Sequence, residues 1–216
     1  MYTVQTIENP STPAHRDCAR STYDLELEDG PFRVGPMTDR PGDDLAQRYG
    51  YANVGSLSRS LPGNSDILDV GAGLSNLGHL VTSRRPDVRW TNFDIRYVPG
   101  LLDSATEEKL DTLQATAPDN LQYVAGNVLE LPQEITAKRY ARIFSYYMLH
   151  HVIGNGREMG FHAVRNILHI GEPGGKLSVG PIGLMLYSTL TVAVPEDPDA
   201  IDALAVQVAD TVRDAG

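Results

Sequence analysis

The hydrophobic positions of this chain change their period repeatedly, and each change marks a predicted element. Short apolar runs typical of buried strands alternate with segments whose apolar residues recur at helical spacing. Strands are predicted at 66–70, 88–95, 121–126, 140–149 and 174–182. Helices are predicted between them at 75–85, 103–117 and 157–170. This alternation predicts an α/β fold, namely a doubly wound, mostly parallel sheet with helices on both faces.

The pattern divides the chain into three regions. Residues 1–63 are irregular and are expected to form an N-terminal segment that can act as a lid. Residues 64–182 form the predicted α/β core. Residues 183–216 are expected to complete the sheet with a β segment at 184–194 and a final helix, for which Asp197 is the predicted N-cap.

Two local signals stand out in the N-terminal region. Alternating apolar residues precede Asp29 and Gly30, a pair that often closes a β-hairpin. Asp43 or Asp44 could begin a short helix, because aspartate is a favoured N-cap residue.

Two glycines mark the junction between the first core strand and its helix, in the stretch DILDVGAGLSNLGHL. Gly71 and Gly73 permit a positive φ and leave the backbone open to close approach. Ligands of open α/β sheets bind at the carboxyl ends of the strands, so a small ligand against these glycines is expected. The alternative is a tight turn without a ligand. A dinucleotide-binding turn would have a third glycine where this chain has Asn76, which disfavours a nicotinamide cofactor.

Composition narrows the kind of partner. The chain has 18 Lys and Arg against 28 Asp and Glu, a net charge of −10 that repels phosphate backbones. No nucleic-acid partner is therefore expected, and a cationic or neutral small ligand suits this charge better. The single cysteine, Cys18, excludes an internal disulfide and a cysteine-based metal site, and no metal is expected. The sequence shows no signal peptide and no apolar run that could span a bilayer, so a cytoplasmic location without membrane contact is expected.

Four motifs resemble those of class I S-adenosylmethionine-dependent methyltransferases, a family with a Rossmann-like fold. The resemblance covers residues 64–182, and in chain order the motifs read LDVGAGLSNLG, TNFDI, VAGNVLELP and RIFSYYMLHHV. It implies S-adenosyl-L-methionine as the cofactor and methyl transfer as the activity. The acceptor implied is a small molecule, because the chain has no large insertion that could hold a macromolecular substrate.

The first two motifs imply where the methionine and ribose parts of the cofactor would lie. The backbone at Gly71, Ala72 and Gly73 would meet the methionine part. Asp94 lies 21 residues after Gly73 and would accept hydrogen bonds from the ribose hydroxyls, with Ile95 beside it.

The third and fourth motifs imply which residues would lie next to the adenine of the cofactor and next to the acceptor. Asn127 stands where the family most often has Asp, and its amide oxygen could still accept from the adenine amino group. Val128 would form part of the adenine wall. Tyr146 is expected to line the pocket while Tyr147 packs on the opposite face, because successive strand side chains alternate.

His150 and His151 are the candidate catalytic residues at the end of the fourth strand. The unperturbed pKa of histidine suits proton transfer near neutrality, and His151 is expected to face the acceptor. The alternative is that both histidines only pack locally, since methyl transfer can proceed mainly by alignment. The predicted function is methyl transfer to an oxygen, nitrogen or carbon nucleophile. A catalytically silent, methyltransferase-like binding or partner protein stays open, and a nicotinamide-dependent oxidoreductase is less favoured.

Overall fold

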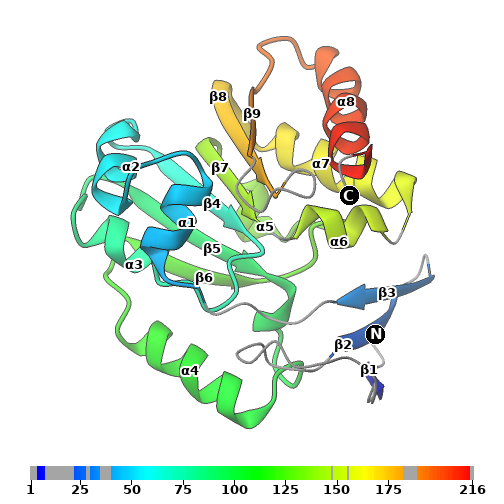
Figure 1. The fold of residues 1–216 in the computed structure, drawn as a ribbon, viewed down its shortest axis with the longest axis horizontal. Helices are drawn as coiled ribbons and strands as arrows, with labels where there is room; N and C mark the ends of the chain where they lie inside the picture. Colours follow the sequence, from blue (N-terminus) through cyan, green and yellow to red (C-terminus); the bar gives the residue numbers. More distant parts are fainter. Residues whose placement is uncertain are drawn as a thin grey trace.

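Two β-sheets and eight α-helices make up the described part of the computed structural model (Figure 1). The structure describes residues 4–7, 22–27, 30–34, 40–146, 148–154, 156–181 and 189–214. Within these ranges no helix is long and apolar enough to cross a membrane.

The larger sheet has six strands in the order β6-β5-β4-β7-β8-β9. These strands are β4 (Asp66–Val70), β5 (Arg89–Asp94), β6 (Leu121–Ala125), β7 (Tyr140–Tyr146), β8 (Gly171–Gly180) and β9 (Leu190–Ala193). The first five are parallel, and β9 pairs antiparallel to β8. This arrangement confirms the predicted doubly wound, mostly parallel sheet. The strand order reverses between β4 and β7, and this is the place where such sheets bind ligands.

Helices cover both faces of this sheet (Figure 1). One face carries α1 (Gly42–Arg48), α2 (Val54–Ser60) and α3 (Leu77–Thr82). The other carries α5 (Gln133–Thr136), α6 (Leu149–Gly154), α7 (Arg157–His169) and α8 (Ala200–Asp214). The 3₁₀ helix η1 (Ile95–Tyr97) follows β5 directly, and α4 (Ser104–Ala115) comes next along the chain.

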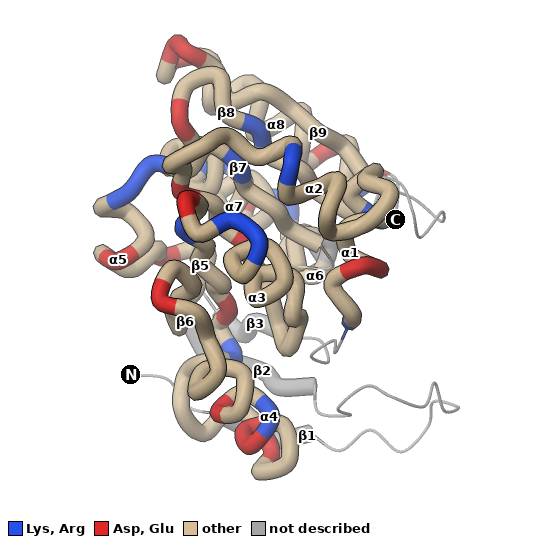
Figure 2. Tube along the Cα trace, turned by 90° about the vertical axis from the view of Figure 1, so that its left-hand side faces the viewer, with Lys and Arg blue, Asp and Glu red and all other residues tan. Residues whose placement is uncertain are grey.

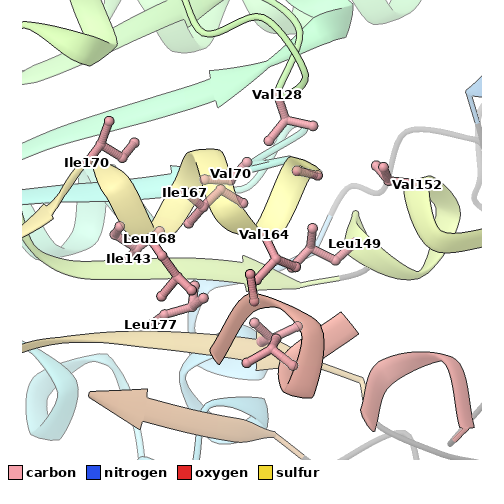
Figure 3. Close-up of a cluster of buried hydrophobic side chains, with 14 of the residues drawn as sticks. Val70, Val128, Ile143, Leu149, Val152, Val164, Ile167, Leu168, Ile170 and Leu177 are labelled. Carbon is pink, nitrogen blue, oxygen red and sulfur yellow. The ribbon is translucent and has the colours of Figure 1, made fainter. Parts of the chain in front are cut away.

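Strand β4 is the centre of the core because both of its faces are covered. Leu68 and Val70 pack in the cluster formed with α6, α7 and α8, which Figure 3 shows. Ile67 packs on the opposite face with residues of α1, α2 and α3. Asp69 shares the face of Ile67, since side chains alternate along a strand, and so a carboxyl group lies inside the α1–α3 layer.

The N-terminal strands form a separate antiparallel sheet, β1 (Val4–Ile7), β2 (Thr22–Leu27) and β3 (Gly30–Val34). Leu27 of β2 pairs with Gly30 of β3, which confirms the predicted hairpin. Asp29, which was expected to form its turn, and Cys18 lie outside the described residues.

Helix α1 begins earlier than predicted, at Gly42, and Pro41 occupies the N-cap position. The predicted capping by Asp43 or Asp44 is therefore wrong. Both acids instead lie in the first turn, where a negative charge favours the helix dipole. Asp43 Oδ1 accepts the Val54 N–H at 2.9 Å and so joins α1 to α2.

At the C-terminal end, β9 occupies part of the predicted 184–194 segment, and residues 182–188 lie outside the described ranges. Helix α8 begins at Ala200, so the predicted N-cap position of Asp197 is wrong. Asp197 instead accepts the N–H of Asp199 at 3.0 Å in the turn that precedes the helix. Figure 2 shows acidic and basic residues interspersed along the outer helices and turns. Two salt bridges at the surface, Arg157–Asp210 and Arg165–Asp202, join α7 to α8.

Candidate functional site

The glycine turn after β4 is tied to the end of β5. Gly71 has φ +76° and Gly73 has φ +57°, both in the left-handed region that favours glycine. The N–H groups of Gly71 and Ala72 donate to the carbonyl oxygen of Phe93, at 2.7 and 3.4 Å. The N–H of Gly73 donates to Asp94 Oδ2 at 2.9 Å. Three successive backbone N–H groups are thus directed into the protein.

The chain's own Met148 makes the close approach at Gly71. A Cβ atom on Gly71 would lie 2.4 Å from Met148 Cβ, closer than real Cβ atoms come to their neighbours. The need for glycine at position 71 therefore follows from this packing and from its positive φ. Cofactor contact at Gly71, Ala72 and Gly73 stays a prediction.

Asn76, which replaces the third glycine of a dinucleotide-binding turn, has a structural partner. Its side-chain Oδ1 accepts the N–H of Gly42 at 2.7 Å, which holds the start of α1 against the start of α3. Sequence reasoning missed this bond because its partners lie 34 residues apart.

Asp94 lies at the end of β5 beside the glycine turn, as its spacing from Gly73 predicted. Besides the Gly73 N–H, its carboxylate accepts the N–H of Arg96 through Oδ1 at 2.9 Å. The side chain is buried, and this burial raises the pKa of Asp94 despite both hydrogen bonds. Each carboxylate oxygen has two lone pairs, so Asp94 retains capacity to accept further hydrogen bonds.

Asp69 is a second buried carboxyl group at this end of the sheet, and sequence reasoning missed it. It pairs in register with Asn92, and Asp94, two residues further along β5, points to the same face. Asp69 is 3% exposed, and its Oδ2 has no hydrogen-bond partner among the described residues. Burial is the main cause that raises the pKa of Asp69 to about 7, and the charge of Asp94 is the second cause. The only signal in the sequence is that Asp69 stands between the apolar Leu68 and Val70 in the strand DILDV, whose other acid, Asp66, lies at its first position.

Two tyrosines and an arginine lie on the same face as Asp69. The Tyr49 ring packs 4.6 Å from that of Phe144 and 5.6 Å from that of Tyr146, measured between centroids. Arg48 Nη1 lies 3.5 Å from the Tyr146 hydroxyl. Burial, and then the charge of Asp69, raise the pKa of Tyr49 well above its usual range. Its hydroxyl is buried and lacks a hydrogen-bond partner within the described part of the chain. Tyr146 thus contacts the end of α1 through Arg48 and Tyr49, and its place in the cofactor pocket stays a prediction.

The fourth strand ends earlier than predicted, at Tyr146, and helix α6 begins at Leu149. The prediction of a strand over 140–149 is wrong because Met148 already accepts helical hydrogen bonds, from the N–H groups of His151 and Val152 at 3.0 and 3.3 Å. His150 and His151 consequently lie on α6. The side chain of His150 lies outside the described residues, as does Tyr147.

The imidazole of His151 is partly buried and lies near Arg96. Burial, and then the positive charge of Arg96, lower the pKa of His151 below its usual 6.5. Both effects favour the neutral imidazole, which is the form that is able to accept a proton.

The residues expected around adenine come from the segment after β6 and from η1. Asn127 is buried, and its Oδ1 accepts the N–H of Leu129 at 3.0 Å. Val128 is buried in the cluster of Figure 3, against which Ile95 also packs. The structure thus brings Ile95 and Val128 to one apolar cluster. Among the described residues, no group of three His, Cys, Asp or Glu side chains could hold a metal ion.

Comparisons with known proteins find solved structures that have a similar fold. No family model and no curated protein matches the chain. The chain is similar to the solved structure of the CcbJ methyltransferase from Streptomyces caelestis, with 18% identity, a TM-score of 0.47, and 64% of this chain and 49% of that one covered. It is also similar to the N-methyltransferase NodS from Bradyrhizobium japonicum WM9, solved with S-adenosyl-L-homocysteine, with 20% identity, a TM-score of 0.42, and 60% and 59% covered. The chain spans less than two thirds of the length of each.

Proposed function

We propose that this protein binds S-adenosyl-L-methionine at the carboxyl ends of β4 and β5 and transfers its methyl group to a small-molecule acceptor. The observation that carries the proposal is the pair of buried carboxyl groups, Asp69 and Asp94, beside a glycine turn whose N–H groups are all used within the protein. This arrangement suits a positively charged ligand.

The same arrangement disfavours a dinucleotide. A pyrophosphate is held by backbone N–H groups that point at the ligand from the turn and from a helix N-terminus. Here the N–H groups of Gly71, Ala72 and Gly73 point at acceptors on β5. Two carboxyl groups beside the turn would also repel a phosphate.

S-adenosylmethionine supplies an activated methyl group on a sulfonium and also carries an α-ammonium group. The unpartnered Oδ2 of Asp69 fits such a cation, because a buried carboxylate is stable only when it is paired. The remaining lone pairs of Asp94 would accept from the ribose hydroxyls. The adenine ring of the cofactor would lie against Ile95, Asn127 and Val128.

Ligand binding by the parent protein tests this proposal. S-adenosylmethionine and S-adenosylhomocysteine are expected to raise the melting temperature, and NAD to leave it unchanged. A ligand present at a hundred times its dissociation constant stabilises the folded state by about 2.7 kcal/mol, which is easily measured. Stabilisation by NAD alone would overturn the proposal. A broad acceptor panel then separates an enzyme from a silent binding protein, since only an enzyme forms S-adenosylhomocysteine.

Replacing Asp94 with alanine is expected to weaken binding of S-adenosylhomocysteine about tenfold, or about 1.4 kcal/mol. The loss is moderate because the carboxylate is already shared with two backbone N–H groups. Isothermal titration calorimetry would measure it. Asp103→Ala is a matched control, because Asp103 also accepts a backbone N–H at a helix start, that of Thr106. It should lose stability by about 1 kcal/mol and keep its affinity. Equal affinity of the parent and Asp94→Ala would contradict the ribose assignment.

Replacing His151 with alanine is expected to lower kcat about 100-fold if the acceptor must lose a proton, which is a usual magnitude for general base catalysis. The affinity for S-adenosylhomocysteine should stay unchanged. Turnover would be followed from pH 6 to 9 with an acceptor found in the panel. His162→Ala is the control, because His162 is exposed on α7. Full turnover of His151→Ala across this range would leave alignment alone as the mechanism.

A further inference from the structure

We propose that Tyr97 is a positioning residue for the cofactor, because it fixes the glycine turn through the carbonyl oxygen of Gly73. The Tyr97 hydroxyl donates to this carbonyl at 2.6 Å, while the N–H of Gly73 donates to Asp94 at 2.9 Å. Both peptide groups that flank the Cα atom of Gly73 are therefore held by the end of β5 and by η1. This inference rests on the proposed function, since it concerns the same site.

The hydroxyl of Tyr97 is a reliable hydrogen-bond donor in this setting. The side chain is 8% exposed. Burial, and then the nearby Asp94 carboxyl, raise the pKa of Tyr97 well above its usual range, so the phenol keeps its proton. A short hydrogen bond from a protonated phenol to a buried carbonyl leaves neither group unsatisfied.

Packing fixes the direction of the Tyr97 ring. It lies in a small apolar cluster with Leu74 and Leu110, so α4 supports it from behind. The ring also meets Tyr123 edge to face, with 5.5 Å between centroids. Helix α4, strand β6 and Leu74 thus hold the ring, and the hydroxyl is directed at the turn.

The restraint has a consequence for binding. Gly73 has a positive φ, and glycine has more backbone freedom to lose than any other residue. A turn that is already fixed before the cofactor arrives loses less entropy on binding, which strengthens affinity without a new contact. The same two bonds fix Asp94 relative to the turn, so the groups proposed for ribose and methionine form one unit.

Tyr123 offers a matched control. Its ring touches that of Tyr97, but its hydroxyl lies 2.9 Å from His79 Nε2 on α3, away from the turn. Tyr97→Phe and Tyr123→Phe each remove one hydroxyl from the same aromatic cluster. Only the first should change the glycine turn.

Binding of S-adenosylhomocysteine to the parent, Tyr97→Phe and Tyr123→Phe, measured by calorimetry, tests the inference. The dissociation constant of Tyr97→Phe is expected to rise about tenfold, and that of Tyr123→Phe to stay within twofold of the parent. Urea unfolding of the three proteins shows whether the two variants lose similar stability. Parent-like affinity of Tyr97→Phe with lowered stability would make Tyr97 a purely structural residue and overturn the inference.

Hydrogen exchange in the free proteins gives a second readout. The amides of residues 71–75 should exchange about tenfold faster in Tyr97→Phe than in the parent, and at the parent rate in Tyr123→Phe. Unchanged exchange in Tyr97→Phe would also overturn the inference. If the parent itself fails to bind S-adenosylhomocysteine, the proposed function fails, whereas a binding parent with an unaffected Tyr97→Phe refutes only the role of Tyr97.

Discussion

Replacing Asp69 with asparagine is expected to stabilise the unliganded protein at neutral pH and to weaken cofactor binding. Moving a carboxyl pKa from 3.8 to about 7 corresponds to about 4 kcal/mol. Asparagine carries no charge, but it still buries a polar amide. The cost of burying this amide offsets part of the stabilisation. We expect a net increase of about 2 kcal/mol in the free energy of unfolding at pH 8.

The pH dependence isolates this effect. Between pH 4 and 7 the folded protein keeps a proton on Asp69 that the unfolded chain has released. The parent therefore loses stability as pH rises through this window, and the loss is complete above it. Asp69→Asn lacks this contribution. Its advantage over the parent in urea unfolding should be about 2.7 kcal/mol larger at pH 8 than at pH 5, and an equal advantage at both pH values would contradict the prediction.

The loss of cofactor binding is expected to be about 30-fold, or about 2 kcal/mol, because a buried charge pair is broken. Methylthioadenosine supplies the control, since it lacks the amino-acid part that carries the ammonium group. Calorimetry should show that Asp69→Asn binds S-adenosylhomocysteine more weakly than the parent does and binds methylthioadenosine with unchanged affinity. Equal weakening of both ligands would place the contact of Asp69 elsewhere.

Replacing Gly71 with alanine is expected to cost about 3 kcal/mol or more of unfolding free energy. A residue with a Cβ atom pays about 1–2 kcal/mol to adopt a left-handed conformation such as φ +76°. The new Cβ would also lie 2.4 Å from Met148 Cβ and 3.6 Å from its Cα, atoms that a rotamer change cannot move away. Overpacking of this kind typically adds 1–3 kcal/mol.

Gly100→Ala separates the two costs of the Gly71 substitution. Gly100 has φ +84°, and a Cβ placed there would meet nothing within 4 Å. It should therefore show the backbone cost alone. Met148→Ala should not rescue Gly71→Ala, because alanine retains the Cβ atom. Equal destabilisation by Gly71→Ala and Gly100→Ala in urea would exclude the contact with Met148.

The central strand and the parallel sheet could be predicted because their signals are local. The predicted bounds of β4, 66–70, are those of the structure, since a run of buried apolar residues ends at a glycine. The spacing of Asp94 from Gly73 spans one helix and one strand, which brings the two together whatever the details of packing. These features follow from periodicity and chain geometry.

The end of the fourth strand could not be predicted in the same way. Apolar and aromatic residues continue without a break past Tyr146, and a short apolar run fits a strand or a buried helix equally well. The choice is made by α6, which buries Leu149 and Val152 against the core and so turns the chain into a helix.

The sequence by itself determined the doubly wound core, the glycine turn and the acid that meets it, because each depends on neighbours within one βαβ unit. Only the tertiary structure decided that Asp69 is buried beside Asp94, that Met148 fills the space at Gly71, and that Tyr97 holds Gly73. These contacts join residues 24 to 77 positions apart, and burial raises a carboxyl pKa only once the surrounding layers have closed around it.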